Sequence, residues 1–162
     1  MTPYKVLQIN KKPQTRGEVG LPKICTPDAT ITLNGIDGDY NRFRSQKKND
    51  NPNMAIMILS NDILQELNSE GWPVKPGDLG ENITIEGIDY LHFSPLKKYR
   101  IGEAIIEITF ICDPCMSLKV LPYVGEKHIN KFIKTLIKRR GWYARVLKSG
   151  KIKVGDQLQS ID

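Results

Sequence analysis

The stretch Pro76–Ile85 reads P-G-D-L-G-E-N-I-T-I and places a glycine–acid pair shortly before a β-prone run. The same order returns in I-G-E-A-I-I-E-I-T (Ile101–Thr109) and in V-G-D-Q-L-Q-S-I (Val154–Ile161). Glycine allows the backbone twist of a tight turn that leads into a strand. Short strands joined by such turns predict a mainly β protein, and we expect a small closed or nearly closed β-barrel. Within the first stretch, Glu81 and Asn82 are interpreted as structural, with Asn82 bonding the backbone of its own turn.

Further short apolar runs between turn residues complete the predicted β set. Expected strands are Tyr4–Ile9, Ala29–Leu33, Met54–Leu59 and Trp142–Leu147, and a hairpin turn at Ser149–Lys151 returns into Ile152–Val154. The polar segment between Tyr40 and Pro52 predicts a loop that is either mobile or faces a ligand.

Two or three helices are expected around the strands. Ser60 is a good N-cap, and a short apolar stripe follows it before Gly71. A second helix is predicted over Lys127–Arg140, because its apolar residues recur at helical spacing: Ile129, Phe132, Ile133, Leu136 and Ile137.

The chain has 162 residues, a length typical of one domain, and we expect residues 1–162 to form a single domain. No run approaches the roughly 20 apolar residues of a membrane span. The first ten residues lack the long apolar core of a secretory signal. These features predict a cytoplasmic protein that does not enter a membrane.

Charge is distributed unevenly along the chain. Residues 1–91 hold 10 Lys and Arg against 12 Asp and Glu, a net −2, whereas residues 92–162 hold 14 against 6, a net +8. The second half can therefore attract an anion such as a phosphate-bearing cofactor, a nucleotide or a nucleic acid. An equally open interpretation is a solvated basic surface.

Cysteine carries the main chemical prediction. In I-T-F-I-C-D-P-C-M-S-L (Ile108–Leu118) an apolar run delivers Cys112 and Cys115 to its end, and Pro114 stops the strand. A neighbouring Arg or Lys, or free backbone N–H groups at a helix start, favours a thiolate there. Cys25, the third cysteine, lies among Pro and Gly residues and is given no role.

The C-x-x-C spacing leaves several possibilities open. The chain has two His residues, so it offers few ligands for a Cys/His zinc site. Cys112 can resolve a persulfide or sulfenic acid on Cys115 through an internal disulfide. A dithiol redox protein is therefore one alternative, and a pair of small buried residues at a strand end is another.

The succession of motifs resembles the MOSC domain family, named for the C-terminal domain of molybdenum cofactor sulfurase, in its small stand-alone bacterial form. The motifs are G-L-P-K (Gly20–Lys23), N-G-I-D-G-D (Asn34–Asp39), the Pro76–Ile85 stretch, the Pro114–Cys115 dipeptide and G-W-Y-A-R-V-L-K-S-G-K-I-K-V-G-D (Gly141–Asp156). The resemblance spans about Tyr4 to Ile161, and it implies a β-barrel with a few helices.

The resemblance also implies a function for one thiol. The family cysteine maps to Cys115, which binds molybdenum or carries sulfur for a molybdenum–pterin cofactor; many relatives have a basic residue where Cys112 stands. Implied activities are sulfur transfer, or a component that reduces N-hydroxylated bases, with the cofactor or a sulfur-donor protein as partner. Pyridoxal phosphate is mentioned for the family, but no lysine here is assigned a Schiff base.

Other candidate ligand contacts come from the residues themselves. Arg145 shares a strand face with Tyr143 and Leu147, so at a barrel mouth it can hold an oxyanion such as a pterin phosphate. Weaker candidates for ligand contact in neighbouring loops are Lys23, Gly38, Asp39 and Arg42.

One rival is a module without catalysis that binds an anion or RNA. Its surface would be Lys131, Lys134, Lys138, Arg139 and Arg140. No aromatic residues are interleaved with these lysines, which argues against nucleic acid as the partner.

Overall fold

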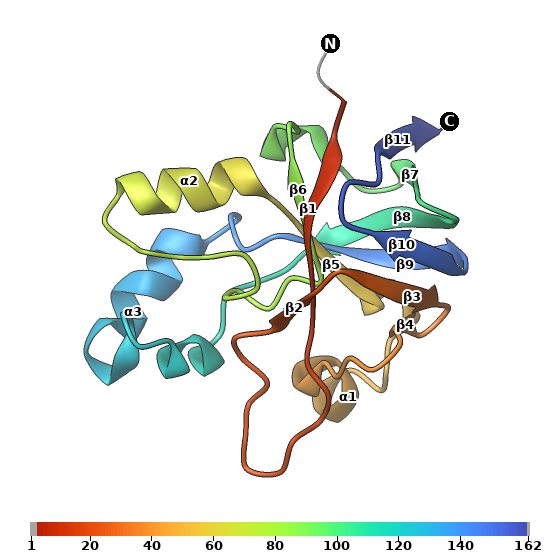
Figure 1. The fold of residues 1–162 in the computed structure, drawn as a ribbon. Coiled ribbons are helices and arrows are strands. Elements are labelled where there is room, and N and C mark those ends of the chain that lie inside the picture. The colour runs from red at the N-terminus through yellow and green to blue at the C-terminus, as the bar shows by residue number, and fades with distance from the viewer. Residues whose placement is uncertain (1–2, 162) are drawn as a thin grey trace.

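The computed structural model describes residues 3–161, which form a mainly β fold with three α-helices. Eight strands make one sheet in the order β11-β7-β8-β9-β5-β6-β1-β2, and three make a second in the order β10-β3-β4 (Figure 1). The large sheet comprises β1 (Lys5–Lys11), β2 (Ile24–Thr26), β5 (Ile56–Ser60), β6 (Ile83–Glu86), β7 (Lys98–Ile101), β8 (Ala104–Ile111), β9 (Trp142–Lys148) and β11 (Leu158–Ile161). The small sheet comprises β3 (Asp28–Thr32), β4 (Gly35–Ile36) and β10 (Gly150–Lys153).

The expected barrel closure is not supported, because neither sheet closes on itself within residues 3–161. One isolated bridge, between Lys5 and Gln157, joins β1 to the segment before β11. A closed barrel needs continuous backbone pairing between the two ends of the sheet. Beyond the bridge at Lys5, the C-terminal half of β1, from Ile9 onward, pairs with β2 and not with the segment near β11. The large sheet therefore remains open.

The predicted hairpin between β9 and β10 is wrong. β10 pairs with β3, with Gly150 opposite Ile31 and Ile152 opposite Ala29. This pairing buries Ile152 in a core cluster to which both sheets contribute. The chain therefore passes from the large sheet at β9 to the small sheet at β10, and Ile152 is buried in the core after this crossing.

The helices are α1 (Arg42–Lys47), α2 (Asn61–Ser69) and α3 (Gly125–Leu136), joined by the 3-10 helices η1 (Pro52–Met54), η2 (Tyr90–His92) and η3 (Met116–Val120). Ser60 is confirmed as an N-cap, since its Oγ accepts a hydrogen bond from the Asp62 amide at 3.2 Å. Figure 1 shows α2 and α3 on one side of the strands and α1 near β4. No helix in the described residues has the length and apolarity needed to cross a bilayer.

Two of the helices differ from expectation. α1 lies inside the segment predicted as a loop, and it is short and polar, so it has no apolar stripe to reveal it. It is anchored by Arg44, whose guanidinium donates to the carbonyls of Asn34, Asp50 and Asn51. α3 ends at Leu136, so Arg140 is not a helical residue.

The Pro76–Ile85 stretch is a structural centre of the fold, as expected, but Asn82 does not bond its own turn. Its Oδ1 accepts from the Met57 amide at 3.0 Å, and its Nδ2 donates to the Asn10 carbonyl and to Asp39. Asn82 thus ties three separate chain segments together. Glu81 beside it is fully buried, and its Oε2 accepts from the Thr84 hydroxyl at 3.0 Å.

Glu81 makes the stability of the protein depend on pH. Burial raises the pKa of its carboxyl from 4.5 to about 7. The unfolded chain releases the proton near pH 4.5 and the folded chain near pH 7, so folding is favoured below pH 4.5 and loses that advantage as pH rises through 7. The loss amounts to about 3 kcal/mol. In urea titrations between pH 4 and pH 8, we expect the unfolding free energy of the wild type to fall by this amount relative to that of Glu81→Gln. A difference that stays constant across this range contradicts the prediction.

Candidate functional site

A cavity of about 400 Å³ opens where several separated segments meet. Residues 19–23 form one wall, and α1 with its flanking residues, between Tyr40 and Asn51, forms another. The end of β8 and the segment that follows it, residues 110–117, form a third. The volume falls in the range typical of small-molecule sites, about 300–1,000 Å³.

Cys115 lines this cavity and is partly exposed. It directly follows Pro114 and is the N-cap residue of η3. Its Sγ lies 3.2 Å from the Ser117 hydroxyl and 3.1 Å from Nη1 of Arg140. The predicted thiol at the end of the β run is therefore accessible and lies beside a positive charge.

Arg140 belongs to this site, although the sequence analysis placed it on the basic surface of the rival interpretation. Its side chain is buried, and its Nε donates to the Leu79 carbonyl while Nη1 donates to the Asp113 carbonyl, both at 3.1 Å. Gly141 follows at φ +123°, where a Cβ would stand 2.9 Å from the Ile58 carbonyl oxygen. This turn carries the chain from α3 into β9 and directs Arg140 inward. The sequence signal that could have drawn attention to Arg140 was its position just before the G-W-Y-A-R motif.

The two thiols have opposite electrostatic environments. Partial burial opposes ionisation of Cys115, but the charge of Arg140 and hydrogen bonds from Ser117 and Arg140 outweigh it, so its pKa is lowered. Burial raises the pKa of Cys112, and Arg140 offsets this only in part. Cys112 is 3% exposed, and its Sγ lies 3.3 Å from the Tyr143 hydroxyl. These surroundings therefore favour the thiolate of Cys115 over that of Cys112.

This difference predicts a pH profile for alkylation. Because the pKa of Cys115 is lowered in the folded protein, its alkylation rate with iodoacetamide should reach a plateau at lower pH in the folded protein than in the same protein unfolded in urea. Cys112 should stay unlabelled in the folded protein. Peptide mass spectrometry after timed labelling measures the rate at each cysteine. Equal midpoints for Cys115 in the folded and the unfolded protein contradict the assigned role of Arg140.

Arg145 is not brought to the cavity. It is exposed on β9, and its Nε donates to Oε1 of buried Glu107 at 2.7 Å. The strand face that Arg145 shares with Tyr143 reaches the cavity only at the Tyr143 end. The ion pair with Glu107 gives Arg145 a structural role on the surface of the large sheet.

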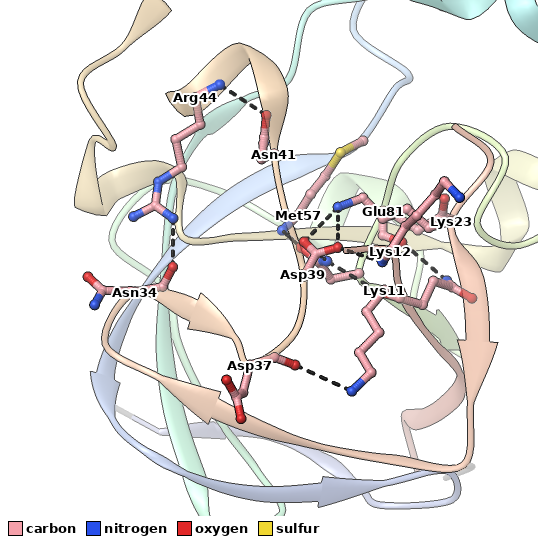
Figure 2. Close-up of polar contacts among 12 residues, drawn as sticks. Lys11, Lys12, Lys23, Asn34, Asp37, Asp39, Asn41, Arg44, Met57 and Glu81 are labelled. Carbon is pink, nitrogen blue, oxygen red and sulfur yellow. Dashed lines mark hydrogen bonds and ion pairs between the residues drawn. The ribbon is translucent and has the colours of Figure 1, made fainter. Parts of the chain in front are cut away.

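Lys23 and Asp39 are brought together, as Figure 2 shows, but they bind each other. Nζ of Lys23 lies 2.6 Å from Oδ2 of Asp39 in a nearly buried ion pair. Asp39 also accepts from the Lys12 amide and from Nδ2 of Asn82. Lys23 lines the cavity, yet its charge is neutralised by Asp39.

Of the remaining candidates, Arg42 reaches the cavity and Gly38 does not. Arg42 is exposed at the start of α1 and contacts Gln46 through Nε at 3.3 Å. Lys48, just after α1, also lines the cavity. Gly38 lies in the turn after β4, beside the ammonium group of Lys11.

The basic surface of the rival interpretation is not intact. Arg139 forms ion pairs with Glu66 of α2 and with Glu70, the residue that follows this helix. Arg140 points into the site of Cys115. The remaining basic residues on this surface are Lys131, Lys134 and Lys138.

Comparisons with known proteins identify similar folds and one family. No curated protein matched the chain. The chain resembles the crystal structures of the YuaD protein from Bacillus subtilis (TM-score 0.79, 17% identity, covering 99% of this chain and 98% of that one) and of YiiM from Geobacillus stearothermophilus (0.72, 19%, 99% and 76%). It also resembles YiiM from Escherichia coli (0.66, 18%, 98% and 70%). A family model described as the MOSC domain matches residues 45–159, well over half of the chain. The chain therefore belongs to the MOSC domain family.

Proposed function

We propose that this protein binds a molybdenum–pterin cofactor in the cavity beside α1, or carries a sulfur atom for it, through the thiol of Cys115. The observation that carries the proposal is the thiol itself, which is accessible from the cavity and lies 3.1 Å from a guanidinium. A thiolate is a soft ligand suited to sulfur-rich metal centres, and it is also the nucleophile needed to accept sulfur.

The residues that line the cavity fit such a cofactor. Cys115 offers one soft donor, which suits a metal whose other ligands come with the cofactor. Arg42 and Lys48 provide cationic groups for a phosphate at the mouth. Phe43 and Phe110 provide flat apolar surfaces for a ring system. No cluster of three or more His, Cys, Asp or Glu side chains suited to a metal occurs in residues 3–161.

Each group of this chain has a defined task in the proposed site. Arg140 and Ser117 lower the pKa of Cys115 and so favour its thiolate at the cavity wall. Arg42 and Lys48 orient an anionic ligand from the α1 side. The cofactor, when bound, supplies the redox chemistry of the metal, which suits a component of N-hydroxylated base reduction.

The arrangement favours one thiol over a dithiol mechanism. In a dithiol mechanism Cys112 must attack or resolve a bond on Cys115. The Cys112 thiol is buried beside Tyr143, and its raised pKa disfavours the thiolate. Cys112 is therefore assigned to packing at the end of β8.

The test is to purify the protein from cells that synthesise the cofactor and from cells that cannot. We expect molybdenum and pterin in the first preparation, or a persulfide on Cys115 in mass spectra, and no molybdenum or pterin in the second. Molybdenum with pterin supports cofactor binding, and a persulfide without molybdenum supports sulfur carriage. Wild-type protein with neither contradicts the proposal.

A further inference from the structure

Arg140 is a buried cation that no carboxylate neutralises among residues 3–161. Its side chain is 7% exposed, and its hydrogen bonds go to two carbonyl oxygens and the sulfur of Cys115. None of the ion pairs formed in the described part of the chain includes it. A buried charge is costly unless it is paired, so this position favours anions beside it, the thiolate of Cys115 among them.

One nitrogen of this guanidinium remains open to the cavity. Nε and Nη1 are bonded, whereas Nη2 has no partner in the described residues and is not sealed from solvent. Gly80 leaves the space in front of Nη2 free, since a Cβ there would stand 3.7 Å from Nη2 and 3.1 Å from the Leu21 side chain. The N–H groups of Nη2 can therefore meet a ligand that enters the cavity.

The other charged groups of the cavity also favour an anion. Arg42 and Lys48 line it from the side of α1. Lys23 is neutralised by Asp39, and Asp113 is the carboxylate among the lining residues. The balance at the cavity is positive, which attracts negatively charged ligands.

We infer that Nη2 of Arg140 and Sγ of Cys115 form an oxyanion subsite. A ligand of this cavity carries a negatively charged oxygen group that accepts a hydrogen bond from Nη2, and a neighbouring atom of the ligand contacts the sulfur. The inference goes beyond the proposed function, because it requires no cofactor. It defines the ligand class as small molecules whose reacting atom lies next to a carboxylate, phosphate or sulfur oxyanion.

The test compares alkylation of Cys115 by iodoacetate, which is anionic, and by iodoacetamide, its neutral analogue. In both reactions the thiolate sulfur bonds to the methylene carbon and iodide leaves, so the ratio of the two rates does not depend on the thiolate fraction. A Cys25→Ser background removes the exposed thiol. We expect the iodoacetate-to-iodoacetamide ratio to be about tenfold higher in the folded protein than in the same protein in urea, as one charged hydrogen bond allows.

The matched variants are Arg140→Gln and Lys134→Gln, which remove one positive charge each. Arg140→Gln should lower the ratio to the value in urea, and Lys134→Gln, an exposed change on α3, should leave it unchanged. If Arg140→Gln does not fold, competition in the folded background protein decides. At constant ionic strength, phosphate, a tetrahedral oxyanion, or acetate, a planar one, should slow iodoacetate, and the stronger competitor identifies the preferred oxyanion. A folded ratio equal to that in urea, with no competition by either anion, overturns the inference.

Discussion

Replacing Cys115 by serine is expected to remove bound molybdenum and pterin, and any extra sulfur, almost completely. Serine keeps the size of the side chain and can still bond Ser117, but it supplies neither a soft ligand nor a sulfur nucleophile. Changes to groups that only surround a metal ligand already cost about 10- to 100-fold in affinity, so loss of the ligand itself should cost at least about 100-fold. Metal and pterin analysis of protein from cofactor-producing cells measures the effect.

Cys112→Ser is the matched control, because it makes the same chemical change three residues away. Its hydroxyl can still bond Tyr143, so we expect a stability loss of about 1 kcal/mol and full cofactor content. A dithiol mechanism predicts instead that both changes are equally damaging. Retention of the cofactor, or of the extra sulfur, by Cys115→Ser contradicts the assignment of this thiol.

Replacing Lys23 by methionine is expected to lower the unfolding free energy by about 3 kcal/mol. The change removes the cation from a nearly buried pair and leaves the Asp39 carboxylate with the Lys12 amide and Asn82 as donors. Breaking a buried ion pair by removing one partner costs about 3–5 kcal/mol. Urea unfolding at pH 7 measures the loss.

Two further variants separate the buried pair from a general charge effect. The double variant Lys23→Met with Asp39→Asn removes both charges and should recover about half of the loss, because no buried carboxylate is left unpaired. Glu18→Gln disrupts the exposed pair with Lys12 and should cost less than about 1 kcal/mol. If Lys23→Met costs no more than Glu18→Gln, the pair does not hold the loops together as described.

The β-rich character of the fold could be predicted from sequence because its signals are local. Glycine turns, apolar runs and the Ser60 cap each lie within a few residues, and most of the strands and helices expected from them occur near the expected places. Sheet closure and strand pairing were not predictable in this way. Whether β10 pairs with β9 or with β3 depends on which core receives Ile152, and that is a long-range property.

The same distinction explains the site. Cys112 and Cys115 could be singled out because Pro114 and the preceding apolar run lie beside them in sequence, and the resemblance to the MOSC family pointed to Cys115 of the two. Arg140 was not assigned to this site because its contact with Cys115, 25 residues away, is a long-range property that its position before the G-W-Y-A-R motif does not reveal by itself. Arg145 looked equivalent by residue type, but its strand face directs it to Glu107. The alternation of a strand shows which residues share a face, but it does not show what covers that face.

The central claim is that the cavity ligand of this MOSC protein lies against the sulfur of Cys115. The most direct test is peptide-resolved alkylation of the protein purified from cells that make the molybdenum–pterin cofactor and from cells that do not. The account predicts that Cys115 is protected in the first preparation and alkylated in the second, while exposed Cys25 reacts equally in both. Equal alkylation of Cys115 in the two preparations, with cofactor present in the first, contradicts it.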